Sequence, residues 1–115
     1  MKSRMFAVAG LAAVLTFGAG AAAYAADDVP TFELTIKDHM FTPDHIEVPA
    51  GQDVKLVVKN LDPTPEEFES YDLNVEKIIA GGAQGVFLIA PLETGDYKFF
   101  GEFHEDTAQG VLTAK

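Results

Sequence analysis

The stretch HIEVPAGQDVKLVVKN, residues 45–60, predicts two β-strands joined by a tight turn. Apolar and polar side chains alternate on both sides of the turn, and proline and glycine in the Pro49–Gln52 segment favour a change of direction there. Residues two apart on a strand share a face, so each strand has one apolar face for a core. The side chains on these apolar faces are Ile46, Val48, Val54, Leu56 and Val58.

Strand-like segments of similar length follow one another along the rest of the chain. Each is bounded by proline, glycine or acidic turn residues, and none shows the 3.6-residue period of an amphipathic helix. These segments are residues 32–37, 66–73, 75–79, 85–89, 96–103 and 110–114. Seven or eight short strands at this spacing predict an all-β fold, an antiparallel β-sandwich that forms one domain.

Residues 1–25 have the pattern of a signal peptide. Lys2 and Arg4 form a short basic head, an apolar run follows, and Ala23-Tyr24-Ala25 supplies the small residues that signal peptidase accepts. An uncleaved anchor is the alternative, because about 20 apolar residues suffice to span a bilayer. We expect cleavage after Ala25, which leaves residues 26–115 as an exported periplasmic domain that is not inserted in the membrane.

The exported domain is strongly acidic and contains no cysteine. Removing Lys2 and Arg4 leaves six basic and eighteen acidic side chains, a formal charge of about −12. Such a charge repels nucleic acid and attracts cations and basic partner surfaces. No serine-histidine-aspartate order with an elbow motif and no phosphate-binding glycine loop is present. These observations favour a cation-binding or docking protein over a hydrolase or a nucleic-acid-binding protein.

Two acidic segments supply candidate metal ligands. In TPEEFES, residues 64–70, Glu67 and Glu69 share one face of a predicted strand, and Glu66 precedes them. In FFGEFHED, residues 99–106, Glu102 and His104 share a face in the same way. Carboxylates with one imidazole suit iron, manganese or zinc, and copper(II) is also possible. The sequence therefore predicts one metal site that unites these two segments.

Three further residues lie close to this predicted site in the expected topology. His39 and Met40 follow the first strand, and a methionine ligand would widen the choice to copper(I). Core packing is the alternative for Met40, and an exposed turn position is the alternative for His39. Tyr71 shares the face of Glu67 and Glu69, so it is a candidate hydrogen-bonding neighbour of the ligands.

Residues 38–51, DHMFTPDHIEVPAG, resemble the opening of a cupredoxin domain, and the similarity extends over residues 30–115. The resemblance implies a Greek-key β-sandwich. In its register the family's copper-binding cysteine falls on Gly101, its axial methionine on Ala108 and its first histidine on Glu66, so that His104 alone is retained. A blue-copper centre needs a thiolate and two imidazoles. The chain is therefore not expected to form one.

The two acidic segments resemble those of the cysteine-less cupredoxins encoded in bacterial ferrous-iron uptake operons. This resemblance implies a periplasmic protein that binds ferrous iron and oxidises it, as a ferroxidase, for a high-affinity iron permease of the inner membrane. A companion periplasmic iron-binding protein is implied as a second partner. Two alternatives stay open: a non-catalytic carrier for copper or another metal, and a docking subunit whose acids contact a basic partner.

Overall fold

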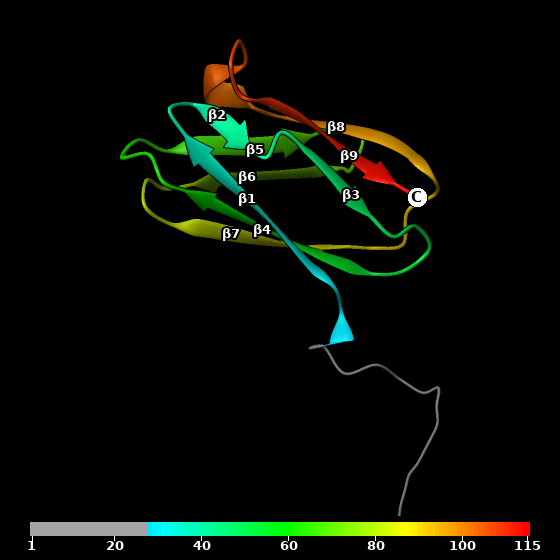
Figure 1. The fold of residues 1–115 in the computed structure, drawn as a ribbon. Coiled ribbons are helices and arrows are strands. Elements are labelled where there is room, and N and C mark those ends of the chain that lie inside the picture. The colour runs from blue at the N-terminus through cyan, green and yellow to red at the C-terminus, as the bar shows by residue number, and fades with distance from the viewer. Residues whose placement is uncertain (1–27) are drawn as a thin grey trace, which may run out of the picture.

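Two β-sheets pack face to face in the computed structural model, which describes residues 28–115 (Figure 1). The expected signal peptide lies outside the described residues. In chain order the elements are β1 (Thr31–Lys37), β2 (Met40–Thr42), β3 (His45–Val48), β4 (Val54–Asn60), β5 (Glu66–Ser70), β6 (Val75–Ile79), β7 (Gln84–Ile89), β8 (Gly95–Gly101), the 3-10 helix η3 (Glu102–His104) and β9 (Gln109–Ala114). Among these residues, no helix is long and apolar enough to cross a membrane.

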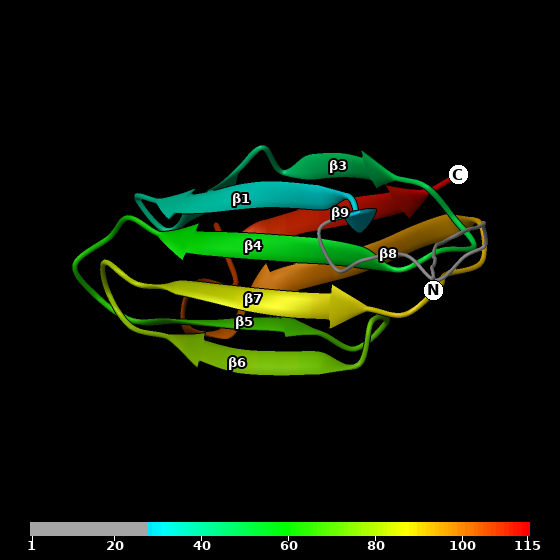
Figure 2. The ribbon, with the colours of Figure 1, turned by 90° about the horizontal axis from the view of Figure 1, so that it is seen from below.

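The strands form a four-stranded sheet in the order β2-β1-β4-β7 and a five-stranded sheet in the order β3-β9-β8-β5-β6 (Figure 2). The expected β-sandwich is confirmed, but both sheets are mixed: β1 runs parallel to β4, and β3 runs parallel to β9. The prediction of a purely antiparallel sandwich was wrong at these two pairs. After β1 and β2 the chain crosses to the other sheet as β3, and β4 then returns to the first sheet and lies beside β1. Alternation of apolar and polar side chains indicates which face of a strand is buried, but it does not indicate which strand pairs with which.

Several strands also differ from the sequence-based expectation, and the strand expected over residues 66–73 ends at Ser70. The three-residue strand β2 is a ninth strand that was not predicted, because it is too short to show alternation. The strand expected over residues 96–103 ends at Gly101, and the chain continues as η3. This last difference changes the directions in which Glu102 and His104 point.

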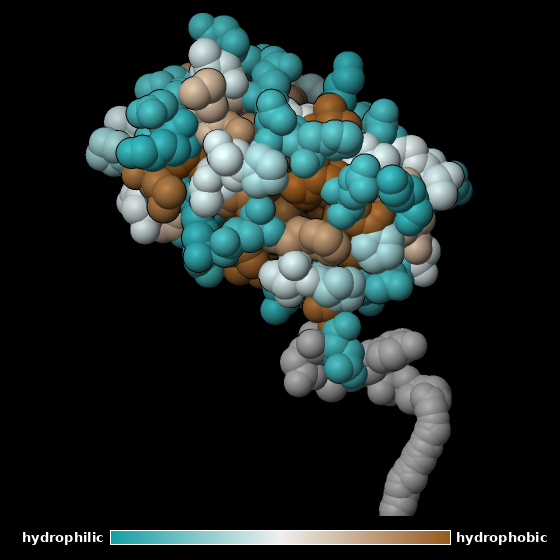
Figure 3. Space-filling model, in the orientation of Figure 1, coloured by the Kyte–Doolittle hydropathy of each residue, from teal (hydrophilic) through white to brown (hydrophobic). Residues whose placement is uncertain are grey.

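An aromatic cluster fills the space between the two sheets. Phe68 is fully buried, and its ring centroid lies 5.4 Å from that of Phe99 and 4.9 Å from that of Phe87. Phe41 packs edge-on against Phe99 at 5.0 Å. Because Phe68 points into this core, the residues directly before and after it on β5 point to the outer face of the sheet. On the face drawn in Figure 3, hydrophilic residues surround a smaller central area of apolar ones.

A two-residue turn between β1 and β2 sets the position of His39. Asp38 and His39 have φ angles of 53° and 60°, and Lys37 pairs with Met40 across the hairpin. Positive φ at both central residues is the geometry of a type I′ turn. The carboxylate of Asp62 accepts the N–H groups of Asp38 and His39 at 2.8 and 2.9 Å. Burial raises the pKa of Asp62, but these two N–H groups outweigh it and hold the pKa below its ordinary value.

We expect Asp62→Ala to lower the free energy of unfolding by about 2 kcal/mol, because two N–H groups lose a charged acceptor. Chemical denaturation measures the change. Asp53→Ala is the matched control, since Asp53 is exposed and has no side-chain hydrogen bond in the described structure. An equal loss in both variants would contradict a specific role of Asp62 in the turn.

Candidate metal centre

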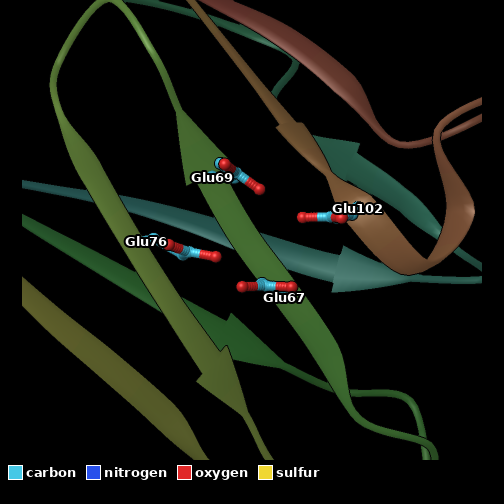
Figure 4. A group of neighbouring side chains, drawn as sticks. All are labelled: Glu67, Glu69, Glu76 and Glu102. Atoms are coloured by element: carbon cyan, nitrogen blue, oxygen red, sulfur yellow. The ribbon is translucent and has the colours of Figure 1, made fainter.

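Four glutamates from three elements meet on the outer face of the five-stranded sheet (Figure 4). Glu67 and Glu69 project from β5, Glu76 from β6 and Glu102 from η3. One carboxylate oxygen of each lies within 4.8 Å of the other three. We call this group the outer cluster. The expected shared face of Glu67 and Glu69 is confirmed, because both members lie here while Phe68 between them is in the core.

Glu69 is the most buried member of the outer cluster. Only 9% of its surface is exposed, and with all four groups ionised its Oε1 atom has no hydrogen-bond donor among the described residues. Nearly all buried polar atoms in proteins have a partner, and one without a partner calls for an explanation such as an absent ion. A cation held between the four carboxylates would be bonded to this oxygen.

The crowded carboxylates of the outer cluster favour protons when no cation is present. The pKa of Glu67 is raised to about 7, first by a hydrogen bond with Glu76, then by burial and by the charge of Glu102. The pKa of Glu69 is also raised to about 7, first by a hydrogen bond with Glu102, then by burial and by repulsion from the same group. A bound divalent cation would replace these protons and compensate the repulsion.

Glu66 and His104 form a second, separate group inside the sandwich. Glu66 is 1% exposed, and its Oε1 atom lies 2.5 Å from Nδ1 of His104. Its Oε2 atom accepts the N–H groups of Phe103 at 2.9 Å and of Glu67 at 3.1 Å. The ring of His39 stacks on that of His104 with centroids 3.5 Å apart. Every oxygen of Glu66 is therefore engaged by the protein itself.

The expectation of one site that unites Glu102 with His104 does not match this arrangement. Residues two apart share a face on a strand, but in a 3-10 helix, with three residues per turn, they point about 120° apart. Glu102 consequently joins the outer cluster, whereas His104 turns inward to Glu66. The N–H of Ala108 bonds the carbonyl of His104 at 2.8 Å, which closes a tight loop directly after the helix.

The remaining predicted candidates, Met40 and Tyr71, and the third histidine of the chain, His45, occupy different surroundings. Met40 is 49% exposed, so the alternative of core packing does not hold for it, and its role as a ligand stays a prediction. Tyr71 is exposed beside the outer cluster, its ring lies tilted against that of Phe100 with centroids 5.4 Å apart, and its pKa is raised, above all by the charge of Glu69. His45 bonds the hydroxyl of Thr113 at 2.8 Å, away from both groups.

Sequence reasoning missed Glu76, which lies directly opposite Glu69 in the β5–β6 hairpin. The signal was available in the turn between Ser70 and Val75. Once these two residues are paired, antiparallel register places residues 69 and 76 side by side with their side chains on one face. Like charges directly opposite one another destabilise a hairpin, so the Glu69–Glu76 pair is unfavourable unless a proton or a cation lies between the two carboxylates.

The four positions that correspond to copper ligands in the cupredoxin register do converge, but not as a copper site. A Cβ atom on Gly101 would lie 2.6 Å from Cδ of Glu66 and 2.9 Å from Cβ of Ala108. No thiolate or thioether is present there, and the Glu66 carboxylate fills the space in front of Gly101. The residues of this chain therefore do not fit a blue-copper centre.

Comparisons with known proteins agree with the observed fold. The family model described as the cupredoxin-like domain matches residues 7–114. An uncharacterized protein of Rickettsia prowazekii (strain Madrid E) is 45% identical over 86 residues, which cover 75% of this chain and 69% of the relative.

Solved structures of a blue copper protein, a purple cupredoxin and a metal-binding domain with copper(I) share the fold. Auracyanin A, a blue copper protein of Chloroflexus aurantiacus, is 16% identical with a TM-score of 0.64, covering 74% of this chain and 98% of its own. The metal-binding domain of the Streptococcus pneumoniae copper(I)-exporting ATPase CopA is 16% identical with a TM-score of 0.66, covering 74% and 84%. A purple cupredoxin of Nitrosopumilus maritimus is 22% identical with a TM-score of 0.55, covering 72% and 98%.

Proposed function

Since this chain belongs to the cupredoxin-like domain family but has no cysteine, we propose that it is a periplasmic protein that binds ferrous iron at the outer cluster and oxidises it. The observation that carries the proposal is the group of four convergent carboxylates with the buried, donor-less Oε1 atom of Glu69. The oxidised ion is passed to an iron permease of the inner membrane, with a companion periplasmic iron-binding protein.

The ligand chemistry supports iron over copper at this site. All four groups of the outer cluster offer carboxylate oxygens, which suit hard cations such as iron, manganese and magnesium. Glu76 and Glu102 are exposed, so an ion can enter and leave from solvent. A closed structural site would instead enclose the metal on all sides.

The same ligands favour oxidation of the bound ion. Four negative charges stabilise Fe³⁺ more than Fe²⁺, because the interaction grows with the charge of the cation. Each ferrous ion gives up one electron, and dioxygen is the acceptor: four ferrous ions and four protons convert one O₂ molecule to two water molecules. Protons held by Glu67 and Glu69 are displaced as iron binds, and they are available where oxygen is reduced.

A non-catalytic copper carrier is the second candidate. His39 stacks on His104, Met40 follows in the chain, and the S. pneumoniae CopA domain, which shares the fold, was solved with copper(I). Imidazole and thioether are the softer ligands that copper(I) prefers. In this alternative the protein binds copper through these side chains, and the outer cluster attracts cations without oxidising them.

We expect the purified protein to accelerate the loss of ferrous iron under air, and we expect Glu67→Gln to abolish most of this acceleration. A ferrous chelator that forms a coloured complex measures the remaining Fe²⁺ over time. His104→Ala should retain more of the activity than Glu67→Gln, since His104 lies outside the outer cluster and acts on it only through the position of Glu102. Glu93→Gln is the control for loss of one exposed acid. Rates equal to those of buffer for the unaltered protein would refute the ferroxidase, and dependence on His104 alone would favour the copper alternative.

A further inference from the structure

We infer that Glu66 determines which metal this protein binds: it closes the place that copper occupies in the cupredoxin register and holds Glu102 in the outer cluster. The inner pole is defined here as Glu66, Gly101, His104 and Ala108, the positions that correspond to copper ligands in the cupredoxin register. Its closure stands on geometry alone, whereas the positioning of Glu102 rests on the proposed function.

The closure follows from the space that the Glu66 side chain occupies. Its Cδ and Oε2 atoms would lie 2.6 and 2.7 Å from a Cβ atom on Gly101, closer than real Cβ contacts. The carboxylate is 1% exposed and accepts hydrogen bonds from Nδ1 of His104 and from two backbone N–H groups. A copper ion at this pole would have to break these bonds and uncover a buried charge, which is costly.

The positioning of Glu102 follows from the contacts of η3. No side chain caps this short helix at its start, but the N–H of Phe103, directly after Glu102, donates to Oε2 of Glu66. His104, the last residue of the helix, donates from Nδ1 to the other oxygen. Because Phe68 anchors β5 in the core, Glu66 is a fixed point from which two bonds hold the backbone that carries Glu102.

Copper(II) titration tests the closed inner pole. Electron paramagnetic resonance of the unaltered protein should show no copper signal that depends on His104. Glu66→Ala should reveal a copper signal with imidazole-nitrogen splitting, and this signal should vanish in the Glu66→Ala/His104→Ala double variant. Glu66→Gln, which keeps the size of the side chain, should stay closed. A His104-dependent signal in the unaltered protein, which does not depend on any variant folding, would overturn the inference.

Manganese(II) binding tests the positioning role. Glutamine at position 66 carries no charge and has one acceptor oxygen in place of two, so the charge-assisted bonds that hold η3 are weakened. Glu66→Gln and Glu102→Gln should each weaken Mn²⁺ binding about tenfold, and the double variant should be no weaker than Glu102→Gln alone. Additive losses would show that Glu66 does not act through Glu102. Absence of Mn²⁺ binding by the unaltered protein would refute the outer cluster as a metal site, and the copper titration would still decide the closure.

Discussion

Glu69→Gln is expected to weaken the binding of ferrous iron by at least about tenfold, the lower end of the range for groups that support a metal site from outside its ligands. Glu69 offers the buried oxygen for which, when all four groups are ionised, no donor exists among the described residues, so its loss removes a ligand and a negative charge together. Glu69→Gln/Glu102→Gln should abolish measurable binding, because half of the charge of the outer cluster is then absent.

Anaerobic isothermal titration calorimetry with Fe²⁺ measures this effect. Glu93→Gln is the matched control: Glu93 is exposed and precedes β8, at the end of that strand opposite to η3. Both variants lose one negative charge, so a general electrostatic attraction would weaken binding equally in both. Equal affinities of Glu69→Gln and Glu93→Gln would show that the outer cluster is a solvated acidic surface and not a site.

The same substitution should stabilise the metal-free protein at neutral pH. Like charges on Glu69, Glu76 and Glu102 repel one another when no cation lies between them, and glutamine at position 69 relieves this repulsion. A variant that is more stable yet binds iron more weakly is typical of a site that sacrifices stability for function. A purely structural role of Glu69 would instead make the variant less stable.

The sequence was sufficient to predict the sandwich, because alternation about Phe68, Leu34 or Val58 depends only on local burial. It did not predict which strands are neighbours: the parallel pairing of β1 with β4 depends on where β3 crosses between the sheets. The meeting of positions 66, 101, 104 and 108 was available from the cupredoxin register, and the structure brings these four positions together.

The division of the predicted site into two groups was not accessible from the sequence. It depends on the 3-10 helix at residues 102–104, which forms because the buried Glu66 bonds the N–H of Phe103. That bond joins residues 37 positions apart, and no local pattern around Glu102 announces it. Glu76 was missed for a simpler reason, since its place beside Glu69 follows from hairpin register and not from the acidic segment itself.

The metal-free protein is expected to lose stability as the pH rises from about 4.5 to about 7. The pKa values of Glu67 and Glu69 are raised from 4.5 to about 7 in the folded state. Between these pH values the folded chain holds more protons than the unfolded chain, so the free energy of unfolding falls with pH. This contribution is fully present below pH 4.5 and is lost as the pH passes 7. Asp62, whose pKa is lowered, acts in the opposite direction but only at more acidic pH.

Urea denaturation at several pH values between 5 and 8 measures this loss, with Glu67→Gln/Glu69→Gln as the variant in which it should disappear. Adding Mn²⁺ should restore stability most strongly at the upper end of the range, because the cation binds the ionised carboxylates of the folded state and not the unfolded chain.

Proton binding and cation binding are linked equilibria: a cluster that holds protons near neutrality must release them when a cation enters. Calorimetric titration in buffers of different ionisation enthalpy should therefore detect proton release at pH 6 and less of it at pH 8. A metal-free protein whose stability rises from pH 5 to 7 would contradict the claim that Glu67 and Glu69 hold protons near neutrality. The repulsion between carboxylates that explains the affinity of the outer cluster for cations would then be contradicted as well.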